Sequence, residues 1–83
     1  MPLYMDVHRL AGGVTIDDVA KAHAADLGVQ DKYEVKYQRY WVDEAEGTIF
    51  CLVEAPSADA AATVHREAHG LVADQIHAVQ EGS

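Results

Sequence analysis

The sequence predicts a small α+β domain in which four strands form one antiparallel sheet and two helices lie on one of its faces. Four segments are strand-like, two of them alternating between apolar and polar residues and one mostly apolar, and helix-like spacing occurs in two segments. These segments follow one another in the order βαββαβ. With 83 residues the chain has room for one hydrophobic core, so we expect a single domain over residues 1–83.

The first half of this order contains a strand, a helix and a second strand. Residues 3–9 alternate strictly and predict the first strand. A helix begins after Thr15, a typical N-cap residue, and ends near Gly28. Its predicted apolar stripe is Ile16, Val19, Ala20, His23 and Leu27. Alternation returns over residues 33–42 and predicts a second strand, rich in the aromatic side chains that strands favour.

The second half contains a hairpin, a helix and a last strand. Gly47 lies near the end of the hairpin connection, and the apolar run 48–55 predicts a central third strand. Ser57 caps a second helix that runs to about Gly70, and residues 75–79 form the last strand. Right-handed crossovers then place both helices on one face, with the first and third strands in the centre. This is the ferredoxin-like sandwich.

The sheet face opposite the helices is expected to be bare. The residues assigned to it are Tyr4, Asp6, His8, Gln38, Tyr40, Phe50, Leu52, Glu54, His77 and Val79. Phe50, Leu52 and Val79 would form an exposed apolar patch, and such patches usually mark an interface. A two-fold homodimer, joined face to face, is the simplest way to cover this patch.

Composition excludes several classes of protein. Fourteen acidic residues against six basic ones give a net charge of −8, which repels nucleic acid and attracts cations. A single cysteine, Cys51, rules out an internal disulfide and a cysteine-based metal site. No apolar segment approaches the roughly 18–20 residues of a membrane span, and the first residues lack a leader pattern. We therefore expect a cytoplasmic protein with no membrane partner.

One candidate site lies on the predicted bare face. Asp6 and His8 project from the first strand, and Glu54 and His77 project from the strands on either side of it. Imidazole and carboxylate donors together suit a borderline divalent metal ion, or acid–base chemistry in a pocket. The same residues also fit ordinary polar positions that are hydrogen-bonded across a dimer, and both interpretations stay open.

A second candidate site lies on the second helix. His65 and His69 are four residues apart and share a helix face, the spacing used by helical metal sites. His65 also borders the apolar stripe of its helix and fits a packed core histidine equally well. His23 is interpreted as a hydrogen-bonded core residue, and Cys51 as a small buried hydrophobe.

Four segments resemble a family of short bacterial proteins, first catalogued as a domain of unknown function, that includes small nickel-binding proteins. They are residues 5–8 (Met-Asp-Val-His), 40–44 (Tyr-Trp-Val-Asp-Glu), 50–56 (Phe-Cys-Leu-Val-Glu-Ala-Pro) and 64–71 (Val-His-Arg-Glu-Ala-His-Gly-Leu). The resemblance implies a ferredoxin-like homodimer that binds nickel at its surface for sequestration or detoxification. Imidazole and carboxylate suit nickel(II), and they also admit cobalt or zinc.

Two functions follow from the sequence. The first is nickel binding without catalysis, with ligands drawn from His8, His65, His69, His77, Asp6 and Glu54. The alternative is a small dimeric ferredoxin-like enzyme or ligand-binding module, in which His8, Glu54 and Tyr40 act as acid–base or polarising groups. A cavity of roughly a few hundred cubic ångströms lined by these side chains would favour the alternative.

Overall fold

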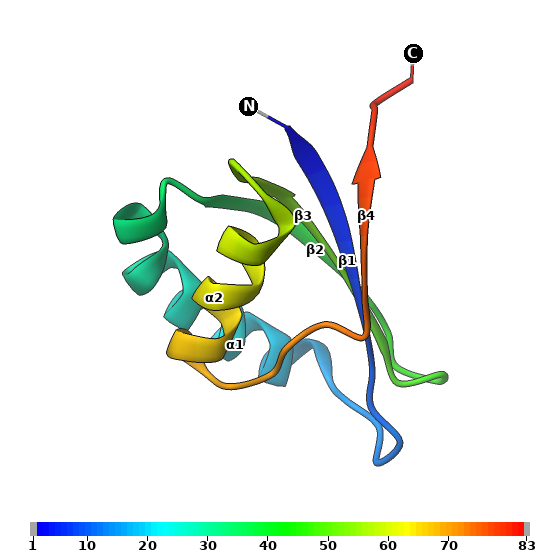
Figure 1. The fold of residues 1–83 in the computed structure, drawn as a ribbon. Helices are drawn as coiled ribbons and strands as arrows, with labels where there is room; N and C mark the ends of the chain where they lie inside the picture. The colour runs from blue at the N-terminus through cyan, green and yellow to red at the C-terminus, as the bar shows by residue number, and fades with distance from the viewer. Residues whose placement is uncertain (1, 83) are drawn as a thin grey trace.

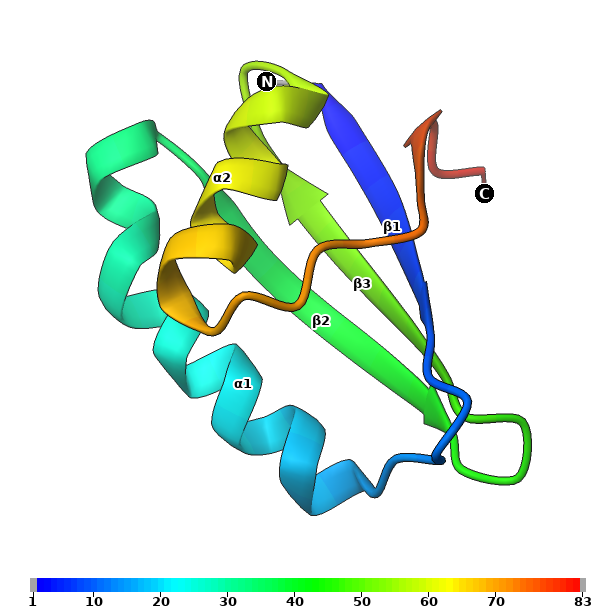
Figure 2. The same cartoon turned by 60° about the horizontal axis from the view of Figure 1, so that its bottom comes forward.

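In the computed structural model, which describes residues 2–82, the elements follow the predicted order. They are β1 (Leu3–Arg9), α1 (Ile16–Val29), β2 (Lys36–Asp43), β3 (Thr48–Glu54), α2 (Ala58–Ala68) and β4 (Gln75–Val79). The strand order is β2-β3-β1-β4, and all neighbours are antiparallel. Both helices lie on one face of the sheet, and no described element covers the other face (Figures 1 and 2). The predicted ferredoxin-like α+β class is confirmed.

Both helices begin at the predicted caps. The Thr15 hydroxyl oxygen accepts a hydrogen bond from the Asp18 N–H at 3.2 Å, and the Ser57 hydroxyl accepts one from the Ala60 N–H at 3.1 Å. α1 ends at Val29, one residue beyond the predicted Gly28, and the chain continues into a 3-10 turn over Gln30–Tyr33 that was not predicted. As a result β2 begins at residue 36. No helix within residues 2–82 is long and apolar enough to span a membrane.

The core lies between the helices and the sheet. Its buried members are Val19, Val35, Tyr37, Ile49, Cys51, Val53, Ala55, Ala61 and Val64. The buried residues of α1 are Val19 and Asp26, whereas Ile16 and Leu27 are exposed. The predicted stripe of α1 is therefore wrong at both ends. A carboxylate faces inward, and it needs a partner there because unpaired buried charge is costly.

Along β1 the two sheet faces are opposite to those predicted. Asp6 pairs with Cys51 and His8 pairs with Ile49, and directly opposed residues share a face of the sheet. Because Cys51 and Ile49 belong to the core, Asp6 and His8 lie beneath the helices, where they are 0% and 4% exposed. Their predicted place on the bare face is wrong. The bare face of β1 instead carries Leu3, Met5 and Val7.

A register shift reverses the faces of β2 partway along the strand. The irregularity lies between Tyr37 and Arg39, as in a β-bulge. Beyond it, Tyr40 pairs with Cys51 on the helix side, and Trp41 pairs with Phe50 on the bare side. The prediction placed Tyr40 on the bare face, and the alternation of residues 33–42 placed Trp41 on the helix side. Trp41 is 46% exposed and Phe50 is 36% exposed, so together they enlarge the apolar surface of the bare face.

Candidate metal centre

The structure divides the six predicted ligands into two groups. Four of them meet beneath the helices, namely Asp6, His8, His65 and His69. The other two lie on the bare face, where Glu54 accepts a hydrogen bond from Gln38 at 2.8 Å and His77 is exposed opposite Met5. The predicted group of Asp6, His8, Glu54 and His77 is therefore not assembled. Shifting the alternation of β1 by one residue moves Asp6 and His8 to the other face of the sheet, which is enough to separate this group.

His65 is the centre of the buried group. Its Nε2 lies 2.9 Å from Asp6 Oδ2, and its Nδ1 lies 2.9 Å from Asp26 Oδ1. Burial alone would oppose the charged ring, but the hydrogen bonds to Asp26 and Asp6 outweigh burial and raise the pKa of His65 to about 9. At neutral pH the ring is thus an imidazolium that donates a hydrogen bond from each nitrogen.

Asp6 is the anion that balances this charge. It accepts hydrogen bonds from His65, from His8 Nε2 at 3.1 Å and from the Tyr37 hydroxyl at 3.1 Å. Burial opposes its ionised form, yet the bonds from His65 and His8 hold the pKa of Asp6 well below its usual range. Burial and the nearby charge of Asp6 also raise the pKa of Tyr37, so this hydroxyl stays a donor.

Asp26, His65 and His69 bring three donor atoms into a nearly equilateral triangle. Asp26 Oδ1 lies 2.9 Å from His65 Nδ1 and 3.0 Å from His69 Nε2, and the two nitrogens are 3.1 Å apart. Ligand atoms placed about 2.1 Å from one metal ion, at right angles to each other, are about 3.0 Å apart. The triangle therefore fits one face of an octahedral ion and leaves its remaining positions open.

His69 must rearrange its proton before it can coordinate. The Leu71 N–H donates to His69 Nδ1 at 3.1 Å, so the neutral ring carries its proton on Nε2. Burial lowers the pKa of His69, which favours the neutral ring that a metal ion requires. Coordination through Nε2 moves the proton to Nδ1 and breaks the bond from Leu71. Metal binding is thus coupled to the turn that ends α2.

A second group of donors, Asp6, His8, Cys51 and His65, lies on the other side of the His65 ring. Burial and the charge of Asp6 raise the pKa of the Cys51 thiol, which makes it a poor ligand. A neutral His65 has one lone pair, so it serves only one of the two groups. If Nδ1 binds the ion, Nε2–H still donates to Asp6, the usual support of a metal-binding histidine.

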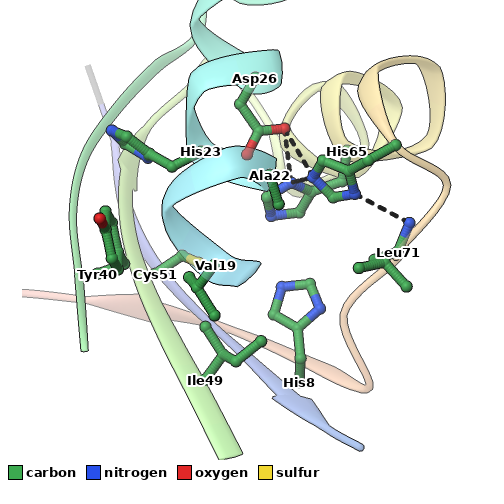
Figure 3. Close-up of a pocket in the computed structure, with 11 residues that line it drawn as sticks. His8, Val19, Ala22, His23, Asp26, Tyr40, Ile49, Cys51, His65 and Leu71 are labelled. Atoms are coloured by element: carbon green, nitrogen blue, oxygen red, sulfur yellow. Dashed lines mark hydrogen bonds and ion pairs between the residues drawn. The ribbon is translucent and has the colours of Figure 1, made fainter. Parts of the chain in front are cut away.

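A small cavity also favours the triangle. It has a volume of about 20 Å³, room for about one water molecule, and all three triangle residues line it. Figure 3 shows Asp26 reaching from α1 to His65 on α2, with the ring of His8 on β1 below them. His23 lines the same cavity and packs against Tyr40, with ring centres 4.9 Å apart.

Sequence reasoning missed Asp26. It lies seven residues after Val19, two helical turns along α1, and these two are the buried residues of the helix. That spacing is the one signal that could have found it. Nothing else in the sequence separates Asp26 from Asp17 and Asp18, two aspartates of the same helix that are exposed in its first turn.

Comparison with known proteins supports an association with nickel. A family model described as "Nickel responsive protein SCO4226-like" matches residues 4–79. The chain belongs to this family. Among solved structures, it is similar to the crystal structure of SCO4226 from Streptomyces coelicolor A3(2), with 46% identity and a TM-score of 0.89, over 98% of this chain and 99% of that chain. No curated protein matches the chain. The family predicted from the four sequence segments is confirmed.

Proposed function

We propose that this protein binds a divalent transition metal ion, nickel(II) in preference to others, at the triangle of Asp26, His65 and His69. The observation that carries the proposal is the set of three donor–donor distances between 2.9 and 3.1 Å, which match adjacent ligands of one ion. Imidazole and carboxylate suit nickel(II), and structural zinc would usually bring cysteines. The nickel response of the family supports the choice of ion.

Burial supports sequestration as the role of the bound ion. Asp26 and His65 are each 2% exposed, so an ion on the triangle is largely covered by α1 and α2. Such an ion leaves only when the helices or the turn after α2 open. An ion that exchanges slowly with solvent suits a protein that withdraws metal from circulation. The protein would do this without catalysis.

We further propose that two copies associate through the bare sheet face. A shallow groove on this face is lined mainly by Leu3, Met5, Trp41, Leu52 and Val79. A two-fold axis would cover this apolar surface with an identical one. The metal triangle lies on the opposite side of the sheet, so each subunit of the dimer would hold its own ion. The resemblance, in contrast, implied nickel at the dimer surface, and the ligand substitutions below separate the two locations.

Calorimetric titration with nickel(II) tests the metal proposal, with cobalt(II) and zinc(II) as comparison ions. We expect Asp26→Asn and His69→Ala to weaken nickel binding by about 100-fold or more, since each removes a ligand. Glu54→Gln and His77→Ala are matched controls on the bare face and should bind as the wild type does. Circular dichroism checks that each variant is folded. Nickel affinity that falls in His77→Ala and not in Asp26→Asn would place the ion on the bare face and overturn the proposal.

A further inference from the structure

A path lined by apolar side chains leads from the metal centre to the surface. It consists of the 20 Å³ cavity beside the triangle and an outer groove of about 210 Å³. The two hollows share the residues Val19, Ala22, Ile49 and Leu71. Figure 3 shows these four side chains around the space next to Asp26 and His65. The metal centre therefore borders a mainly apolar groove, and the inner hollow between them has room for about one water molecule.

The two ends of this path differ in chemistry. At the inner end, an ion on the triangle would keep open coordination positions beside the cavity. The outer groove is completed by Leu10, Gly13, Val14 and Asp18, so it is mainly aliphatic with one carboxylate. A ligand that uses the whole path needs a metal-binding head and an apolar tail.

We propose that the metal-loaded protein binds a short aliphatic monocarboxylate, with its carboxylate on the ion and its alkyl tail in the groove. This inference rests on the proposed metal site. The open coordination positions of a divalent transition metal ion accept oxygen donors, and a carboxylate is one that nickel(II) and cobalt(II) bind. Asp18 repels an anionic head from the outer end, so the direction of binding is fixed.

The volume of the groove sets the length of the tail. The groove of about 210 Å³ is about ten times larger than the inner hollow, which has room for about one water molecule. An alkyl tail of several carbon atoms therefore fits in it. Each methylene group transferred from water to such a surface strengthens binding by up to about fourfold. Affinity should therefore rise with chain length and then level off once the groove is full.

The test is a titration of the cobalt(II)-loaded full chain with acetate, butyrate, hexanoate and octanoate, followed by the visible absorption of the ion. We expect hexanoate to bind at least about tenfold more tightly than acetate, with no further gain for octanoate. The metal-free protein serves as the blank. Equal affinities along the series would overturn the inference while leaving the metal site intact. Failure to take up cobalt(II) or nickel(II) would instead refute the metal proposal.

Two substitutions locate the tail. Ala22→Leu fills the junction of the two hollows and should abolish the preference for hexanoate, whereas Ala20→Leu, exposed on the same helix, should leave it unchanged. Val14→Asp changes only the outer groove, so it should spare acetate and weaken hexanoate about tenfold. If Ala22→Leu does not take up cobalt(II), Val14→Asp alone tests whether the alkyl tail lies in the outer groove. Wild-type preference for hexanoate in Val14→Asp would overturn the inference.

Discussion

The two faces of the sheet are covered by different means. On the helix side, α1 and α2 bury the polar side chains Asp6, His8 and His65 together with the apolar core. Every buried side-chain nitrogen and oxygen in the described part of the chain has a hydrogen-bond partner. On the bare side, Trp41 and Phe50 remain substantially exposed. One face thus satisfies its polar groups within the chain, and the other presents apolar groups with no cover from residues 2–82.

This difference shows that polarity alone does not decide which side of a strand is buried. On β1 the charged Asp6 is fully buried, and its neighbours Met5 and Val7 face the uncovered side. Burial of Asp6 is tolerated because three donors surround it, and a network with every member paired strengthens a low-dielectric interior. The same network becomes a liability when one member is removed.

The two faces should differ most in stability when one carboxylate on each face is neutralised in turn. Asp6→Asn leaves His65 and His8 without their anion, and we expect it to lower the free energy of unfolding by about 3–5 kcal/mol. Glu54→Gln makes the same chemical change on the bare face and should cost less than about 0.5 kcal/mol. Urea unfolding at pH 7 measures both. Equal losses would mean that the buried network contributes no more than a surface hydrogen bond.

The next effect is a dependence of stability on pH. The folded-state pKa of His65, about 9, lies above the usual 6.5, so its contribution is complete below pH 6.5 and is lost as the pH rises through about 9. That contribution is on the order of 3 kcal/mol. We therefore expect the urea midpoint of the metal-free protein to fall between pH 7 and pH 10.

Two variants identify the group responsible for this fall. His65→Gln should flatten the pH profile, and His77→Gln on the bare face should keep it. A wild-type profile that is flat up to pH 10 would contradict the assignment of an imidazolium at His65. Since nickel takes Nδ1 of the same ring, its binding at pH 7 should also release about one proton, which titrations in buffers of different ionisation enthalpy measure.

The sequence was sufficient for the order of elements because their signals are local. Thr15 and Ser57 cap the helices as predicted, alternation marked the first two strands, and an apolar run marked the third. Which side of β1 faces the helices could not be predicted from the strand alone, because it depends on contacts with other elements. The alternation of β1 is clear, but its polar side is the buried one, because partners from other elements satisfy Asp6 beneath the helices and Asp6 in turn pairs with His8. The shift near Gln38 then reversed the second half of β2.

The candidate site was only half predictable for the same reason. His65 and His69 were found because their spacing is a property of one helix. Asp26 was missed because its role depends on α1 packing against α2, a contact between residues 39 positions apart in the chain. The pairing of His8 with Glu54 and His77 failed because it required the phases of three strands to be known at once.

A smaller effect is expected on the bare face. Trp41→Glu places a charge where we propose that two copies meet, and it should weaken self-association by about 30-fold or more. Ala24→Glu, exposed on α1, is the matched control and should leave association unchanged. Sedimentation velocity over a range of concentrations measures both. A wild-type chain that sediments as a monomer at high concentration would rule out this use of the bare face.

The smallest effect distinguishes the two sides of the His65 ring. Cys51 belongs to the donor group around Asp6, and its buried thiol stays protonated because burial and that carboxylate raise its pKa. If the ion lies on the triangle, Cys51→Ala should change nickel affinity by less than about twofold, and the nickel-loaded wild type should lack the near-ultraviolet band of a nickel–thiolate bond. A tenfold loss in Cys51→Ala, together with such a band, would move the ion to the Asp6 side. His65 would then coordinate through Nε2, and Asp26, bonded to Nδ1–H, would become the carboxylate that orients it.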